Sequence, residues 1–166
     1  MGTLAGRNLV TVADLDRAAQ YNPSSISKNG YAYAIAAIPD ADHKAAAYKR
    51  IMEDSSLSND ALTSTANGFL RGDVGLRTPY YKPFFDSLLS MWDTRSIGMA
   101  TRIVRGLYPR SLYNYGSAEG TGVSDNPSVA LAQEWLRKNP SAPSALRRLI
   151  LEAQDNAHRN MIGQQF

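Results

Sequence analysis

The sequence predicts an all-α domain, on the strength of three observations. Apolar residues recur three or four positions apart along nearly the whole chain of 166 residues, as they do on one face of a helix. Ser, Asp and Asn residues that favour helix N-caps, and prolines that end helices, separate these apolar stripes. No segment alternates apolar and polar residues in the way that a half-buried strand does.

The first two helices are predicted from apolar stripes that end at prolines. One stripe stops before Asn22-Pro23, and its members are Val12, Leu15 and Ala19. The second stripe stops at Pro39, and its members are Ile26, Gly30, Tyr33 and Ala37. Glycine within a helix costs about 1 kcal/mol relative to alanine, so the second helix is weakened but still predicted.

The next two helices are predicted from their N-caps. Asp40 is expected to cap one helix, and Ser58 to cap the other. Their inner faces are expected to carry Ala47, Tyr48, Ile51 and Met52 in the first, and Leu62, Ala66, Phe69 and Leu70 in the second. Gly72 and Gly75 then break the chain.

The second half of the chain is predicted to supply most of the core. A helix starts at Pro79 or Pro83, another runs from Ser96 to Pro109, and two more follow Asn126-Pro127 and Pro143. The expected core residues are Phe84, Phe85, Leu88, Trp92, Ile103, Val104, Leu107, Leu146, Leu149 and Ile150. Together these elements predict an irregular α-solenoid, a HEAT-like array of about seven or eight antiparallel helices.

Residues 1–166 are predicted to form a single helical domain. Residues 110–125 contain Gly116, Gly120, Gly122 and several serines, so they are predicted to be a flexible loop. The start of the chain is rich in apolar residues, namely Leu4, Leu9, Val10, Val12 and Leu15. We therefore predict an apolar surface around the first helix, where a preceding helical segment packs.

Composition argues against several classes of function. The chain has no cysteine, which removes disulfides, thiolate metal sites and cysteine nucleophiles and fits a cytoplasmic protein. Its net charge is only +3, and no run approaches the ~20 apolar residues of a membrane span, so neither a nucleic acid nor a membrane is expected as partner. His43 and His158 stand outside any H-E-x-x-H motif. No nucleophile elbow, P-loop or dinucleotide-binding glycine motif occurs, so no catalytic, cofactor-binding or metal-ligating residue is assigned.

Two charged features remain as candidates. Asp14 and Asp16 lie two positions apart and so point away from each other on a helix, which favours a solvated face over acid–base catalysis. Arg95, Arg102 and Arg105 follow one another at spacings of seven and three. A row of guanidinium groups could contact a peptide or another domain, because each group binds a carboxylate through two hydrogen bonds. A solvated face, or pairing with acids of another domain, is the stronger interpretation of these arginines.

Several segments, in their order along the chain, resemble the C-terminal region of bacterial aminopeptidase N of the actinobacterial type, whose C-terminal domain is similar to that of the endoplasmic-reticulum aminopeptidases. These segments are Ser55-Ser56-Leu57-Ser58-Asn59, Gly68-Phe69, Pro79-Tyr80-Tyr81-Lys82-Pro83-Phe84-Phe85, Met91-Trp92-Asp93-Thr94-Arg95-Ser96, Ile103-Val104-Arg105-Gly106-Leu107-Tyr108-Pro109 and Ala145-Leu146-Arg147-Arg148-Leu149-Ile150-Leu151-Glu152. The resemblance covers roughly residues 9–162, and residues 114–125 form a longer loop than the family has.

The resemblance implies a HEAT-like C-terminal domain of a zinc metallopeptidase, a hydrolase that removes single residues from peptide N-termini. In that family the zinc motif, glutamate base, G-x-M-E-N segment and catalytic tyrosine all lie upstream, so the catalytic domain is absent from this chain. No cofactor is implied here, and zinc belongs to the catalytic domain of the parent enzyme. The implied partners are the upstream catalytic and helical segments and the peptide substrate in their shared chamber.

Three functions stay open. The leading one is a non-catalytic C-terminal domain that closes the substrate chamber, either as an excised domain or as a separately encoded remnant. The second is a stand-alone helical-repeat module that binds a peptide or protein partner on a concave face. An independent enzyme is the third, and it is least favoured because the zinc motif is missing.

Overall fold

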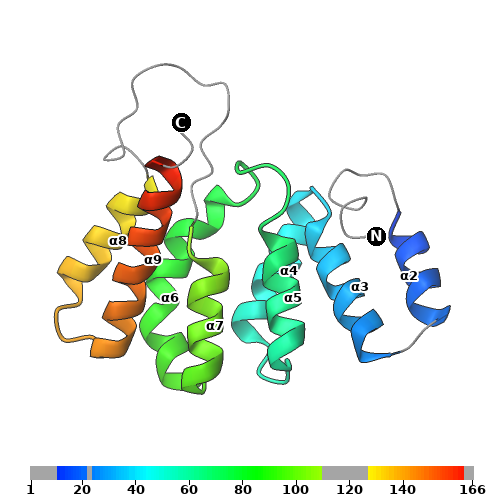
Figure 1. The fold of residues 1–166 in the computed structure, drawn as a ribbon, viewed down its shortest axis with the longest axis horizontal. Helices are drawn as coiled ribbons and strands as arrows, with labels where there is room; N and C mark the ends of the chain where they lie inside the picture. Colours follow the sequence, from blue (N-terminus) through cyan, green and yellow to red (C-terminus); the bar gives the residue numbers. More distant parts are fainter. Residues whose placement is uncertain (1–10, 22–23, 110–126, 163–166) are drawn as a thin grey trace, which may run out of the picture.

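The computed structural model describes residues 11–21, 24–109 and 127–162, and these ranges hold eight α-helices, one short 3-10 helix and no strand (Figure 1). The elements are α2 (Val12–Tyr21), α3 (Ser25–Ala37), α4 (Ala41–Glu53), α5 (Asn59–Phe69), η1 (Thr78–Tyr80), α6 (Tyr81–Thr94), α7 (Ile97–Leu107), α8 (Pro127–Lys138) and α9 (Ser144–Ile162). The all-α class is confirmed. The predicted loop at 110–125 lies outside the described residues, as do Leu4, Leu9 and Val10.

The helices form two layers along the length of the molecule (Figure 1). In one layer α3 contacts α5, α5 contacts α7, and α7 contacts α9. In the other layer α6 contacts α8, and α4, α6 and α8 each pack against the next helix along the chain. This order agrees with an array of antiparallel helix pairs, and the HEAT-like solenoid geometry stays a prediction.

The predicted N-caps are confirmed where the structure describes them. Asp40 Oδ1 accepts a hydrogen bond from the backbone N–H of His43, at 2.9 Å. Ser58 Oγ caps α5 and Ser96 Oγ caps α7 in the same way. These side chains satisfy backbone donors that the first turn of a helix leaves without intrahelical partners.

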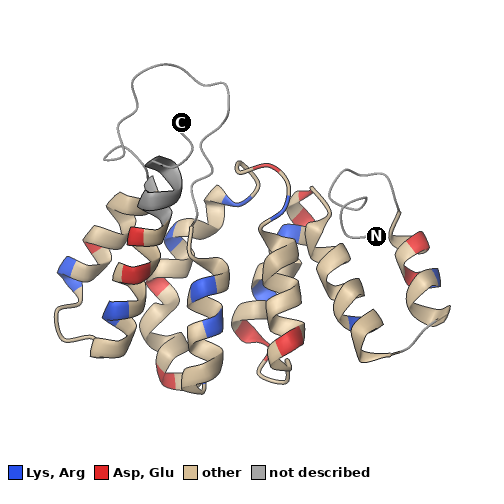
Figure 2. Cartoon of the chain, viewed as in Figure 1, with Lys and Arg blue, Asp and Glu red and all other residues tan. Residues whose placement is uncertain are grey.

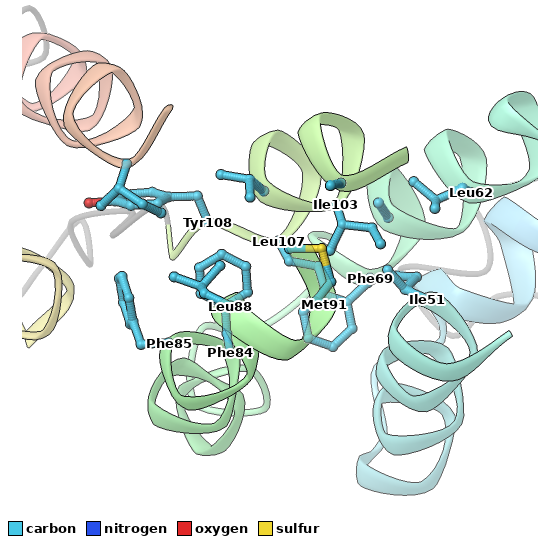
Figure 3. Packing of buried hydrophobic residues seen from close by; sticks show 14 of the residues in the cluster. Ile51, Leu62, Phe69, Phe84, Phe85, Leu88, Met91, Ile103, Leu107 and Tyr108 are labelled. Carbon is cyan, nitrogen blue, oxygen red and sulfur yellow. The ribbon is translucent and has the colours of Figure 1, made fainter. Parts of the chain in front are cut away.

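The main hydrophobic core lies between the two layers (Figure 3). Eight of the ten predicted core residues are buried: Phe84, Phe85, Leu88, Ile103, Val104, Leu107, Leu146 and Ile150. Trp92 and Leu149 are only half-buried and pack against the edge of this core, so their assignment was wrong. Trp92 shares the angular sector of Leu88 and Phe85, but it lies in the last turn of α6, where the helix ends, whereas Met91 is 4% exposed.

α3 buries only part of its predicted apolar stripe: Ala37 is buried and Tyr33 is half-buried, but the first two positions of the stripe are not. Ile26 is 84% exposed and Gly30 is exposed as well. Besides Ala37, the buried residues of α3 are Ala32, Ala34 and Ala36, which the stripe did not include. α3 contacts α2, α4 and α5, so it is covered on several sides, and such a helix has no single apolar stripe to detect.

α5 lies between α3 and α7, and glycines make both contacts close. A Cβ atom at Gly68 would stand 2.2 Å from the carbonyl oxygen of Tyr33 and 2.9 Å from Cβ of Ala36. A Cβ atom at Gly106, in α7, would stand 2.8 Å from Cβ of Ala66 in α5. Because real Cβ atoms do not approach other atoms so closely, each contact requires glycine as the helices now lie.

Lys44 joins three helices through one buried ammonium group. From α4, its Nζ donates hydrogen bonds to the carbonyl oxygens of Ala36, at 2.7 Å, and Gly68, at 3.3 Å. These carbonyls belong to the last turns of α3 and α5, where the helix dipole is negative and favours a cation. The side chain is fully buried, and this burial, followed by the charge of Arg77, lowers the pKa of Lys44 to about 8.

The Gly68→Ala variant is expected to lose about 1–3 kcal/mol of unfolding free energy, because its Cβ would collide with the backbone of α3. The matched control is Gly30→Ala, since nothing lies within 4 Å of a Cβ at that position in α3. The control is expected to gain about 0.5–1 kcal/mol from helix propensity. Urea unfolding of both variants measures the difference, and equal stability of Gly68→Ala and the parent chain would contradict the close approach.

The unfolding free energy is expected to rise with pH between about 7.5 and 9.5. An unfolded lysine keeps its proton up to its ordinary pKa of 10.5, whereas folded Lys44 releases it near 8, so the unfolded chain binds more protons in this window. The expected rise is about 2 kcal/mol. Denaturation at stepped pH measures it, and the window ends below the ordinary tyrosine pKa of 10.0. Lys44→Met should flatten the profile, and a variant with an unchanged slope would refute the role of Lys44.

Candidate functional site

The arginines singled out as candidate contact residues belong to two elements. Arg95 is the C-cap of α6, and its side chain is half-buried. Its Nη2 donates a hydrogen bond to the carbonyl oxygen of Met52, at 2.7 Å, near the end of α4. Arg95 therefore links the C-terminal ends of α4 and α6, and this guanidinium group is already partly engaged.

Arg102 and Arg105 are exposed on α7. Figure 2 shows the basic residues of this helix in blue. Arg102 Nη1 is 3.4 Å from the carbonyl oxygen of Gly98, one turn earlier in the same helix. The opposite face of α7 enters the core through Ala100, Ile103, Val104 and Leu107. The two guanidinium groups thus form the solvent-facing part of the predicted row, and their chemistry suits a carboxylate on a peptide or on another domain.

A cleft of about 570 Å³ is lined by residues of α2, α3 and α5. Its apolar lining includes Leu15 and Ala18 of α2 and Ile26 of α3, and its polar lining includes Ser64 and Asn67 of α5. Ile26 is 84% exposed, and it adds to the apolar surface that the cleft lining provides. The cleft therefore offers apolar surface at the end of the array where the described chain begins.

Asp14 and Asp16 do not form a common site. Asp14 accepts hydrogen bonds from the backbone N–H and the hydroxyl of Thr11, and these bonds lower the pKa of its carboxyl group. Asp16 accepts a hydrogen bond from the hydroxyl of Tyr31, at 2.6 Å, and so fastens α2 to α3. Each carboxylate has a separate structural role, in agreement with their expected separation along the helix.

The histidines give no catalytic arrangement in the described ranges. Nδ1 of His43 lies 2.6 Å from Oδ2 of Asp40, so the ring adds to the cap of α4. The side chain of His158 lies outside the described residues. In the part of the chain that the structure describes, no group of three His, Cys, Asp or Glu side chains is placed to hold a metal ion. Over the same residues, no helix combines the length and the apolar character of a membrane span.

A second groove, of about 290 Å³, lies between α6 and α8. Its apolar lining includes Phe85 and Trp135, and two ion pairs stand along it. One pair joins Lys82 to Asp86 at 2.6 Å, and the other joins Lys138 to Glu134 at 2.5 Å. Each pair spans four residues of one helix, so the groove has both signs of charge and does not favour a partner of one charge.

Sequence reasoning missed two buried cations, Lys44 and Arg77. Arg77 lies in the connection between α5 and α6, and only 2% of its surface is exposed. Its Nε and Nη2 have no hydrogen-bond partner among the described residues. No periodic pattern identifies such a residue, because a basic side chain in a glycine-containing connection is ordinarily solvated.

Comparison with known proteins finds one informative similarity. No family model matches the chain. The chain is 30% identical over 135 residues to aminopeptidase N of Streptomyces lividans. The matched residues make up 80% of this chain but only 14% of that protein, so the chain spans a small part of its relative's length. Most of this helical chain is therefore similar to one portion of an aminopeptidase N.

Proposed function

We propose that this chain is a non-catalytic helical domain of the aminopeptidase N type, equivalent to the C-terminal region of such an enzyme. In this role it closes the substrate chamber of a peptidase that releases N-terminal amino acids from peptides. The observation that carries the proposal is 30% identity over 80% of a chain whose described residues fold into helices alone. The similarity to a 14% portion of the relative fits one domain of a larger assembly.

The cleft between α2 and α3 is proposed as the surface that meets the preceding helical segment. Helical arrays are stable when each repeat is covered by a neighbour, and an end repeat without a polar outer face needs a partner. At this end Ile26 is 84% exposed and Tyr21 is 95% exposed. Ala18 and Ala19 line the adjoining cleft and are half-buried, whereas Leu15 at its base is only 2% exposed, so an amphipathic helix could bury its apolar face against Ile26 and the two alanines.

Arg102 and Arg105 are proposed to face the substrate chamber and not the docking cleft. They project from α7, whereas the cleft is formed by α2, α3 and α5, so the two surfaces involve different helices. A domain docked through the cleft keeps the exposed face of α7 available to the chamber. Peptide substrates carry carboxylates, and so do acidic surfaces of a catalytic domain, and guanidinium groups bind both.

The chain by itself is expected to bind no stoichiometric zinc and to release no amino acid from aminoacyl substrates. Zinc peptidases need about three protein ligands and an open coordination position, and the described residues place no group of three possible ligands together. Metal analysis of the purified chain, with an aminoacyl-anilide assay, tests this. One tightly held zinc per chain together with chelator-sensitive hydrolysis would favour an independent enzyme instead.

Docking is expected to depend on Ile26. The test mixes this chain with the aminopeptidase N of Streptomyces lividans from which the matching portion has been removed, and measures association by calorimetry. Ile26→Glu should weaken association at least tenfold, because a charge would be buried in the contact. The matched control is Ile97→Glu, since Ile97 is 72% exposed at the start of α7 and outside the cleft. No association at high micromolar concentration would favour the stand-alone module.

A further inference from the structure

Two cationic side chains are buried close to each other where α4 meets the connection between α5 and α6. Lys44 is fully buried and Arg77 is 2% exposed. The two groups lie close enough to interact, because the charge of Arg77 contributes to the lowered pKa of Lys44. Buried charges in proteins are ordinarily paired or hydrogen-bonded, so two neighbouring cations require an explanation.

The two cations differ in how well they are satisfied. Nζ of Lys44 has the carbonyl oxygens of Ala36 and Gly68 as acceptors. Arg77 has none for Nε and Nη2, and these two atoms form one edge of the guanidinium plane. That edge carries two parallel N–H groups, which match the two oxygens of a carboxylate. The unused donors of Arg77 thus have the geometry of a carboxylate receptor.

The acids nearest to the two cations are already engaged. Asp40 raises the pKa of Lys44 through its charge, but its oxygens accept hydrogen bonds from the backbone and ring of His43. Asp73 acts in the same way on Arg77, and its Oδ1 accepts a hydrogen bond from the N–H of Gly75, at 2.7 Å. Neither carboxylate is bonded to the free edge of Arg77, so the local charge stays positive.

Tyr81 adds a further donor to this region. Its hydroxyl is buried and has no hydrogen-bond partner among the described residues. Burial raises the pKa of this phenol, while the charge of Arg77 lowers it, so the two groups lie close enough to interact. A phenol that keeps its proton can donate to an anion. The region therefore combines two cations with a neutral donor, and no acceptor among the described residues is hydrogen-bonded to Nε and Nη2 of Arg77 or to the hydroxyl of Tyr81.

We propose that Arg77 is the centre of an anion site that takes a compact carboxylate, such as formate or acetate, on its Nε and Nη2 edge. The residue's 2% exposure leaves no opening for a peptide chain, which is why the ligand must be a free small ion. Arg71, Asp73 and Gly75 lie near Arg77 in the sequence and are exposed, so an ion that reaches Arg77 has to move part of the connection between α5 and α6. The site does not depend on the proposed role in an aminopeptidase.

Titration of the ¹⁵N-labelled chain with sodium acetate, at constant ionic strength set with sodium chloride, tests the proposal. Saturable shifts of an arginine Nε–H signal are expected with acetate and formate, and no such shifts with benzoate, which is too large. The melting temperature should rise along the same binding curve, because a ligand that binds only the folded chain stabilises it. Absence of any saturable change with acetate would overturn the site.

Substitutions identify the residue responsible. Arg77→Met should weaken acetate binding at least tenfold, and Arg77→Lys should weaken it as well, because lysine keeps the charge but loses the two-donor edge. The matched control is Arg71→Met, which removes an exposed guanidinium from the same connection and should leave the affinity unchanged. If Arg77→Met does not fold, two other measurements test whether Arg77 binds acetate. These are the acetate affinity of Arg77→Lys and the assignment of the shifted Nε–H signal to one arginine. Equal affinity of Arg77→Lys and the parent chain, or loss of binding in Arg71→Met, would overturn the assignment to Arg77.

Discussion

The close packing of α5 between α3 and α7 is the constraint on which the rest of the fold depends. Gly68 lets the backbone of α3 approach without an intervening side chain, and Gly106 does the same for α7 against α5. Because α3 and α5 end at the same level, the carbonyl oxygens of Ala36 and Gly68 come within reach of one ammonium group. The glycine contact thereby creates the place that Lys44 of α4 fills, and it ties the second layer to the first.

Basic side chains repeat this arrangement at other helix ends. Arg95 donates to the carbonyl oxygen of Met52 in the last turn of α4. Arg147 of α9 donates to the carbonyl oxygens of Leu136, at 2.8 Å, and Asn139, at 2.6 Å, where α8 ends. The last carbonyls of a helix lack intrahelical donors and stand at its negative pole, so a cation from a neighbouring helix satisfies both needs. Several basic residues of this chain therefore stabilise the C-terminal ends of neighbouring helices by hydrogen bonds, and are not simply solvated charges on the surface.

This use of basic residues also explains what could and could not be predicted from the sequence. Local signals were sufficient for the caps at Asp40 and Ser58, for the start of a helix after Ser96 and for most of the core, since these depend on neighbours along one helix. The burial of Lys44 and Arg77 depends on contacts between helices, and a polar residue in the pattern gives no sign of it. The cleft was anticipated only as an apolar surface near the first helix, because the alanine face of α3 carries no stripe.

The cleft follows from the same packing that builds the core. All the buried residues of α3 belong to its second half, from Ala32 to Ala37, where Gly68 allows α5 to come close. The first half of α3 has no such contact, and its Ile26 and Gly30 line the cleft together with residues of α2. Close packing at one end of α3 and an uncovered apolar wall at the other are thus two results of one arrangement. A helix placed against Ile26 would contact the first half of α3, beside α2, and the buried residues in the second half of α3 would keep their contacts.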